Sequence, residues 1–421
     1  MNKKKILLWS GALLAILGLA YGVYRWMQPQ SIVLEDGTRI TLLGVTYGEK
    51  HVSPIPWVMP KTVRSAHVTT SNDTLYAWFY VQSKTRNTPY FEVFAYDQEK
   101  SACVASQGRN YGNGRAANAV IGFNFAAFPR HGSKIIFRLM QWGRNGQEDI
   151  PGQFAISNPD RERVSSSWPI QSLPDKQSDG DLDVTLDRVG YDDNAFFYGN
   201  NSEAGKSDLR NRGVVTQFRI EQNGEVATNW QAVQVETSDA SGNHVKNNNS
   251  SIQRENGEPV FVYQWGLWPD EPAWKLHMEF SRTSGFDPGE VWSVNEIPIE
   301  KGNVNTRWQR DPKAASVAEA TFGNSVVKLM SVKKFPANQV QGWGLDSELV
   351  LVAAPDLDGY RITILKLTDE QGHEIPSFNY GQSAGQYHYG LRGLGDAKTV
   401  NAVIAIHRSR FFDFTIKPPK L

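Results

Sequence analysis

Apolar and polar residues alternate in many short segments along the chain, and the alternation has a period of two. The clearest example is YRITILKL at 360–367, where Ile362 and Ile364 fall on one side and Arg361 and Thr363 fall on the other. A period of two is the side-chain period of a strand with one buried face. Branched and aromatic residues dominate these segments, and they suit a pleated, half-buried surface. The pattern therefore predicts an all-β protein.

The alternating segments belong to a two-strand pattern that occurs three times, at 75–98, 215–242 and 348–372. Each copy has an apolar run, a polar turn and a second alternating run that ends in an Asp and a further turn. Asn223-Gly224 and Asp358-Gly359 separate the runs of the second and third copies. Such dipeptides favour the positive φ angles of hairpin turns, so we expect hairpins at these positions.

Each copy is followed by a closing segment with an aromatic residue, and these residues are Phe154, Trp292 and Phe414. The separation between the Asp turn and this aromatic residue is similar in all three copies. The constant order predicts one sandwich-type domain that is used three times. The sequence leaves open the alternative of three all-β domains that share only an aromatic closing strand before a Pro.

Polar stretches without an apolar period divide the chain into parts that are each long enough to bury a core. We predict linkers at 163–181 and 301–315. Three β-sandwich domains, Ig-like or jelly-roll-like, are predicted at 31–162 (with an N-terminal hairpin), 182–300 and 316–421. Within these parts, 107–115 is predicted to be a loop, and 314–320 favours a single helical turn.

Residues 1–30 have the pattern of a cytoplasmic tip, a membrane anchor and a tether. Lysines precede an uncharged run, Ile6 to Tyr24, of 19 residues. At about 1.5 Å per residue this run spans roughly 28 Å as a transmembrane helix, close to the thickness of a bilayer core. The basic flank predicts a cytoplasmic N-terminus and a periplasmic or extracellular bulk. The alternative is a signal peptide cleaved after Ala20, which also leads to export.

Composition narrows the functional classes. Lys+Arg and Asp+Glu both number 44, so the chain lacks the basic field that nucleic-acid binding requires. Cys103 is the only cysteine, so no internal disulfide is possible. The histidines lack zinc spacing, the acidic stretches at 179–183 and 356–358 lack a calcium-loop spacing, and there is no Gly-x-Ser-x-Gly. We expect no cofactor and no metal, and no catalytic residue can be named.

Three tryptophans close together form the first candidate binding surface. Trp265, Trp268 and Trp274 surround a turn, Pro269–Pro272. Exposed tryptophans on a sandwich can stack on sugar rings or bind peptides, because their flat apolar faces bury a large area. The alternative is that Trp265 and Trp274 flank a hairpin turn and anchor the core.

The second candidate is LEDGTRITLLGVTYGEKH at 34–51. It resembles the opening of uncharacterised, membrane-anchored bacterial proteins with an LxDGTxxxLxGVTYGxxH signature after their anchor. The resemblance implies an exported bacterial protein and no catalytic residues. Gly44, Tyr47, Gly48 and His51 are the positions of interest within it, and the structural alternative for them is a tight strand-to-loop turn.

These patterns predict a membrane-tethered, extracytoplasmic array of β-sandwiches that binds or scaffolds, with a protein or glycan ligand. Repetition, zero net charge and the lack of catalytic spacing support this interpretation. The alternative function is an extracytoplasmic hydrolase or carbohydrate-active enzyme that uses carboxylates or His51 in a cleft between domains.

Overall fold

The computed structural model describes residues 30–56, 59, 63–83, 91–97, 103–105, 107–110, 118–143, 146–160, 166–192, 213–246, 252–255, 258–263, 267–302, 316–336, 345–383 and 385–419. Every regular element in these residues is a β-strand, apart from one 3-10 turn, η1 (Pro288–Glu290), which confirms the all-β class. Among the same residues no helix is long and apolar enough to cross a bilayer. The predicted anchor, Ile6 to Tyr24, and Ala20 lie outside them.

Residues 30–160, which we call the first unit, form two antiparallel sheets. One has the order β1-β2-β3-β7-β6, with strands β1 (Ser31–Val33), β2 (Arg39–Val52), β3 (His67–Gln82), β7 (Asn118–Phe125) and β6 (Gln107–Asn110). The other has the order β5-β4-β8-β9, with strands β5 (Cys103–Ala105), β4 (Phe91–Tyr96), β8 (Lys134–Gly143) and β9 (Gly146–Ser157).

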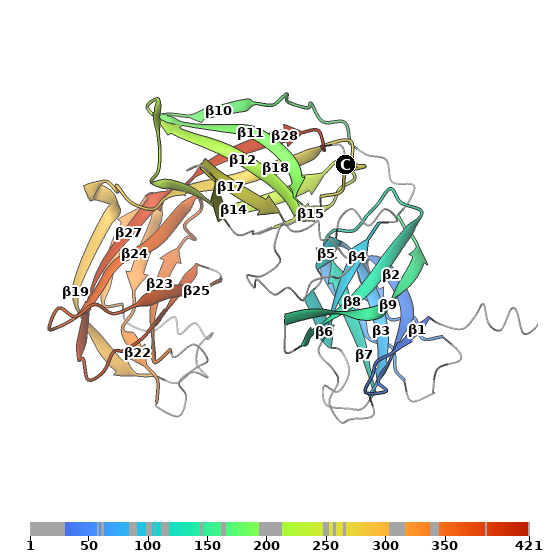
Figure 1. Ribbon diagram of the computed structural model, residues 1–421. Coiled ribbons are helices and arrows are strands. Elements are labelled where there is room, and N and C mark those ends of the chain that lie inside the picture. The colour runs from blue at the N-terminus through green and yellow to red at the C-terminus, as the bar shows by residue number, and fades with distance from the viewer. Residues whose placement is uncertain are drawn as a thin grey trace, which may run out of the picture.

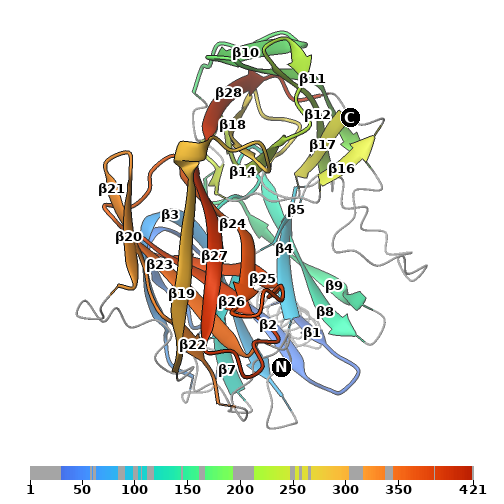
Figure 2. The ribbon, with the colours of Figure 1, turned by 90° about the vertical axis from the view of Figure 1, so that its left-hand side faces the viewer.

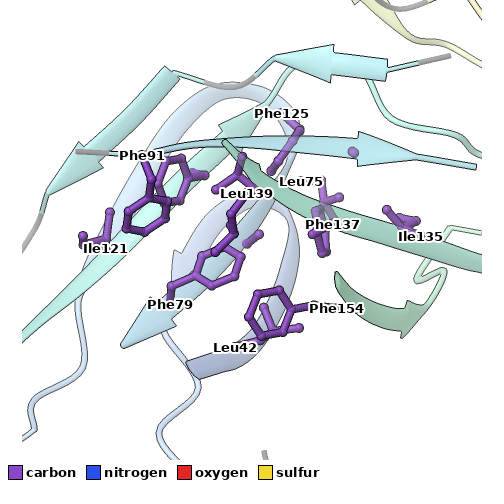
Figure 3. Packing of buried hydrophobic residues seen from close by; sticks show 14 of the residues in the cluster. Leu42, Leu75, Phe79, Phe91, Ile121, Phe125, Ile135, Phe137, Leu139 and Phe154 are labelled. Carbon is purple, nitrogen blue, oxygen red and sulfur yellow. The ribbon is translucent and has the colours of Figure 1, made fainter. Parts of the chain in front are cut away.

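The two sheets of the first unit face each other across one hydrophobic core. Phe79 of the first sheet lies 5.4 Å from Phe154 of the second, measured between ring centroids, and the two rings meet edge to face. Figure 3 shows Phe79, Phe137 and Phe154 in the space between the layers. Aromatic pairs in this arrangement are stabilised beyond their buried area, so the closing aromatic residue of the first copy anchors its core.

The second unit comprises residues 166–290 together with the last strand of the chain. One sheet has the order β10-β11-β12-β17-β16, and β13 (Glu225–Val226) pairs with β12; its strands are β10 (Asp175–Asp179), β11 (Leu182–Asp192), β12 (Gly213–Gln222), β17 (Glu258–Tyr263) and β16 (Ile252–Glu255). The other has the order β15-β14-β18-β28, with strands β15 (His244–Val245), β14 (Trp230–Asp239), β18 (Trp274–Arg282) and β28 (Arg410–Ile416). Both sheets contribute to a second core.

The third unit comprises 316–408 and the strand that precedes them, β19 (Val291–Lys301). Its strands are paired in the order β20-β21-β23-β22-β19-β27-β24, and β26 joins β23 and β25. The remaining bounds are β20 (Ala318–Phe322), β21 (Ser325–Leu329), β22 (Val332–Lys334), β23 (Ser347–Ala354), β24 (Tyr360–Asp369), β25 (Ser377–Ser383), β26 (Gln386–Leu391) and β27 (Thr399–Arg408). They enclose a third core.

The same order of pairing recurs in the three units. A leading hairpin (β1–β2, β10–β11 or β20–β21) pairs with a central strand (β3, β12 or β23), which in turn pairs with β7, β17 or β26. The strand before each Asp turn (β4, β14 or β24) pairs with β8, β18 or β27. The strands β8, β18 and β27 therefore have equivalent places in the three units, and so does the strand that pairs with the other edge of each.

The closing strands of the second and third units are exchanged at that equivalent position. In the first unit β9 pairs with β8, and Phe154 lies opposite Phe137. In contrast, β19 pairs with β27 of the third unit, and β28 pairs with β18 of the second. Trp292 therefore lies opposite Ile404, and Phe414 lies opposite Leu276. This corrects the prediction that each closing segment completes the copy that precedes it.

The exchange creates one antiparallel ribbon that spans both units. β18 continues through residues 283–290 into β19, while β27 continues into β28 with only Ser409 between them. Figures 1 and 2 show β27 rising from the third unit into β28 of the second. The chain thus crosses twice between these units, and each crossing strand is hydrogen-bonded on both sides of the crossing.

Three shorter predictions are also corrected. Asp175–Asp179 was expected in a linker but is strand β10, and Gln107–Asn110 was expected in a loop but is strand β6. The helical turn predicted around 314–320 is wrong, because Ala318–Phe322 pairs with β21 to form a hairpin. Each of these segments is a strand that pairs with the edge of a neighbouring strand. The polar residues within the segment do not reveal this pairing, because it depends on the neighbouring strand.

The signature segment at 34–51 is not a strand-to-loop turn. Its second half lies within β2, whose register shifts at Leu42/Gly44 and Gly48/Lys50. Both glycines have positive φ, 145° at Gly44 and 119° at Gly48. A side chain at Gly44 would also meet Pro54, because its Cβ would lie 2.9 Å from Pro54 Cγ. The glycines therefore permit two bulges in one long strand.

The exchange predicts which unit depends on the C-terminal strand. Phe414 is fully buried in the second core, so Phe414→Ala should lower the free energy of unfolding by about 3–5 kcal/mol. Hydrogen exchange should accelerate mainly in β11, β12, β14 and β18. Phe411→Ala on the same strand is the matched control, because Phe411 is 43% exposed. Faster exchange confined to β20–β26 after Phe414→Ala would contradict the observed pairing.

Candidate functional site

A cleft of about 440 Å³ lies where the third unit meets the outer face of the sheet β15-β14-β18-β28. Residues from β14, β18 and β28 form one wall, and the turn between β23 and β24 forms the other. The lining residues are Gln234, Glu236, His277, Glu279, Phe411, Asp356, Leu357, Asp358, Gly359, Tyr360 and Arg361. The cleft is thus built from both units that share the ribbon.

Strand alternation aims the wall residues of the second unit into the cleft. His277 and Glu279 on β18 alternate with Leu276 and Met278, which are fully buried in the second core. In the third unit the Asp358-Gly359 turn reverses the chain, and Gly359 has a φ of 71°. Leu357 is buried, so the turn is anchored in the third core while Asp356 and Asp358 stay exposed.

The cleft wall contains an ion pair that joins the two units. Arg361 Nε donates to Glu279 Oε1 at 2.7 Å, and its Nη2 donates to Glu279 Oε2 and to Gln234 Oε1. Ser409, the residue between β27 and β28, also donates to Glu279 Oε1 at 2.5 Å. A bidentate guanidinium–carboxylate pair is strong and fixed in direction. It holds the β24 end of the third unit against β18 of the second.

The remaining carboxylates give the cleft an acidic rim. Asp358 and Asp356 stand on one wall and Glu236 on the other, while the single guanidinium, Arg361, is already bound to Glu279. Asp356 Oδ1 accepts hydrogen bonds from Leu357 N and from the Tyr387 hydroxyl. Lys246 Nζ lies 3.8 Å from Glu236 Oε1 and compensates that carboxylate in part. The excess of negative charge at the rim therefore comes mainly from Asp356 and Asp358.

An exposed aromatic ring completes the rim. Phe411 is 43% exposed, and its ring stacks on His277 with centroids 5.5 Å apart and planes 12° apart. His277 Nδ1 lies 3.0 Å from Asp413 Oδ1, which fixes the orientation of the imidazole. The cleft therefore combines acceptor oxygens with one flat apolar surface.

A buried histidine lies close to the ion pair. His407 on β27 has no exposed surface, and its ring lies 4.7 Å from that of Phe286. Burial and the nearby guanidiniums of Arg282 and Arg361 lower the pKa of His407 to about 4. Its Nδ1 has no hydrogen-bond partner within the part of the chain that the structure describes. His407 is therefore neutral near neutral pH.

The tryptophan candidates are not an exposed platform. Trp268 is fully buried and belongs to the core of the first unit, although it lies on the second unit. Trp274 is fully buried in the second core and donates its Nε1 hydrogen to Trp268 O at 2.9 Å. Trp265 lies outside the described residues. The two described tryptophans thus anchor cores, and Trp268 fastens the first unit to the second.

Tyr47 lies at the contact between the first and second units, which we call the first joint. Its hydroxyl accepts a hydrogen bond from Arg130 Nη1 at 3.0 Å, and its ring lies edge-on to Phe128. Arg130 Nε donates to Asn243 Oδ1 of the second unit at 2.9 Å. The structure therefore brings Tyr47 and Trp268 together as parts of one joint, and neither lines the cleft.

His51 is a packed histidine in the first unit. It is 1% exposed, and its ring centroid lies 4.4 Å from that of Tyr76 with the two planes tilted by 38°. Its ring nitrogens lie 3.0 Å from Thr46 Oγ1 and 3.2 Å from Thr74 Oγ1. Burial lowers its pKa. His51 is not among the lining residues of the cleft, so the structure does not unite it with the carboxylates there.

Sequence reasoning did not find most of the cleft. In the sequence, Asp356 and Asp358 form only a short acidic stretch without the spacing of a calcium loop. Within the described ranges, no group of His, Cys, Asp and Glu has the arrangement of a metal site. Glu279, Arg361 and Phe411 are brought together by the exchanged strands. The local signal for Glu279 and Arg361 is that each charged side chain alternates with apolar residues along its strand, β18 or β24.

Comparison with known proteins gives no relative for this chain. No protein-family model, no curated protein and no solved structure matches it.

The burial of His407 predicts that the stability of the second and third units falls in acid. Between pH 6.5 and 4 the unfolded chain binds a proton at this histidine and the folded chain does not, so stability falls as the pH falls through this window. His407→Leu should remove this contribution. Urea unfolding at several pH values measures this contribution. The free energy of unfolding of the variant, minus that of the native chain, should increase steadily as the pH is lowered from 7 to 4. A constant difference would contradict the neutral buried histidine.

Proposed function

We propose that this protein is a membrane-tethered, extracytoplasmic binding or scaffolding protein made of three β-sandwich domains. The charge-free run Ile6 to Tyr24 behind a basic start supports tethering and export. Three hydrophobic cores, each enclosed by strands, support the count of three domains. The resemblance at 34–51 supports a bacterial origin. Ligand binding is assigned to the cleft between the second and third units.

The observation that carries the proposal is the cleft held by the shared ribbon. Two strand crossings and the Arg361–Glu279 pair restrain its walls before any ligand arrives. A site that is already formed pays less ordering entropy on binding, and pre-formed concave sites are the usual location of ligands. A cleft whose walls are fixed in this way suits a protein that holds a partner outside the membrane.

The chemistry of the rim favours a basic peptide segment as the ligand. The carboxylates of Glu236, Asp356 and Asp358 attract an ammonium or guanidinium group, and the exposed face of Phe411 suits a cation or its aliphatic stem. The complementary charge also speeds encounter and makes binding sensitive to salt.

Calorimetric titration of the full-length protein in detergent with a tetralysine peptide tests this function. We expect binding that weakens with salt and that falls about tenfold, roughly 1.4 kcal/mol, in the double variant Glu236→Gln, Asp358→Asn. The variant Glu319→Gln, Glu374→Gln removes the same charge outside the cleft and should bind normally. Binding of a neutral glycan in place of the peptide would refute the basic ligand and keep a binding function. Failure of both would refute the binding function at this site.

A second candidate function is an extracytoplasmic hydrolase or carbohydrate-active enzyme. The observation that favours it is the presence of several carboxylates in a cleft between two units. Against it, the carboxylate oxygens of Glu279 already accept hydrogen bonds from Arg361 and Ser409, so they are not free to contact a substrate. Hydrolysis of a polysaccharide that the Asp358→Asn variant no longer cleaves would decide for the enzyme.

A further inference from the structure

The first joint contains a group of buried carboxyl groups that are remote from the cleft lining. Asp239 is the last residue of β14, Ser241 lies in the turn after it, and Glu271 lies in the loop before β18. Their exposed fractions are 1%, 1% and 4%. Ser241 Oγ is 2.8 Å from Asp239 Oδ1 and 2.9 Å from Glu271 Oε1. From the first unit, His131 Nε2 lies 3.1 Å from Glu271 Oε2.

A proton on one of the carboxyl groups turns both of these contacts into full hydrogen bonds. A serine hydroxyl has one hydrogen to donate, so it can donate to Asp239 or to Glu271 but not to both. Two ionised carboxylates cannot donate, and one of the two short contacts would then be a repulsion between lone pairs. If one carboxyl group is protonated, it donates to Ser241 Oγ and both contacts become hydrogen bonds.

The other hydrogen bonds indicate that the proton is on Glu271. Asp239 accepts from Asn243 N at 2.9 Å and from Asn243 Nδ2 at 2.6 Å, in addition to Ser241. Three donors stabilise the ionised form of Asp239. The carboxyl group of Glu271 has Ser241 on one oxygen and His131 on the other. Burial and the charge of Asp239 raise the pKa of Glu271 to about 7.

Other charged groups around the site come from both units. Burial raises the pKa of Asp239, and its hydrogen bonds and the guanidinium of Arg130 of the first unit oppose that rise. Arg130 also bonds Asp160 and Asn243. Asp270 of the second unit has a pKa raised by burial and by the charge of Asp97 of the first unit, while His131 opposes that rise. The carboxyl groups that face the joint outnumber the guanidinium of Arg130, which favours uptake of a proton.

We propose that one proton held between Glu271 and Ser241 closes the first joint, and that loss of this proton near neutral pH loosens the contact between the first and second units. Above that pH, two buried carboxylates face one hydroxyl at a boundary between separately packed cores. A small movement of the two units that admits water to the boundary reduces this repulsion and hydrates both carboxylates. Acidification reverses this movement, so the first joint is stiff below neutral pH and hinged above it.

The test measures the distance between the units in the full-length protein in detergent. In a Cys103→Ala background, spin labels are attached at Glu35→Cys in the first unit and Val226→Cys in the second, both exposed positions. We expect a narrow distance distribution at pH 5.5 that broadens with a midpoint near pH 7. In Glu271→Gln it should stay narrow to pH 8.5, because the carboxamide donates to Ser241 at every pH. Asp270→Asn, which leaves the Ser241 contacts intact, should keep the transition.

A distribution that does not change between pH 5.5 and 8.5 in the native chain would overturn the proposal, as would an unchanged transition in Glu271→Gln. Infrared spectroscopy of the native chain provides a readout that needs no variant. A protonated carboxyl band present at pH 6 and absent at pH 8.5 is expected, and its absence at pH 6 would overturn the stored proton.

Discussion

The exchange of two closing strands is the constraint on which the rest of the structure depends. β18 and β27 each need a neighbour at the same edge, because an unpaired edge leaves hydrogen-bonding groups and core side chains uncovered. Each obtains it from the other unit, β28 for β18 and β19 for β27. The second core is therefore incomplete until residue 416 has joined it, although its other strands end at Arg282. The cleft, the Arg361–Glu279 pair and the buried His407 all lie near this crossing.

The strands with alternating apolar residues could be predicted from the sequence, but the polar strands β6 and β10 and the partners of most strands could not. Alternation shows which face of a strand is buried, and the predicted hairpin at Asn223-Gly224 is confirmed by the pairing of β12 with β13. The hairpin predicted at Asp358-Gly359 is wrong, because β23 and β24 on either side of this turn pair with other strands, although Gly359 has the positive φ of a tight turn. Trp292 and Phe414 have similar surroundings in the sequence, so either closing segment satisfies the pattern of either unit. Pairing of distant strands depends on side chains from the whole core, and the order along the chain favoured the wrong choice.

The residues of the candidate site could not be predicted from the sequence, because burial and distant contacts determine their roles. A tryptophan on a sandwich is either a binding surface or an anchor, and only burial distinguishes the two. Trp268 is an anchor of an unusual kind, because it lies on the second unit and packs in the core of the first. The charged residues Glu279 and Arg361 look like ordinary solvent-facing positions of separate strands in the sequence. Their bidentate contact exists only because the ribbon brings β18 and β24 together.

The Asp turns show how a repeated element acquires a new role. Asp239 Oδ1 accepts from the backbone of Asn243, and Asp369 Oδ1 accepts from that of His373, so the two turns are built alike. The fifth residue differs in what it can reach. The Asn243 carboxamide accepts from Phe128 N and donates to Phe128 O, which docks the turn on the first unit. The imidazole of His373 bonds back to Asp369 and stays exposed. A carboxamide presents a donor and an acceptor side by side, as a backbone does, so one residue type suffices to convert a solvent-facing turn into a joint.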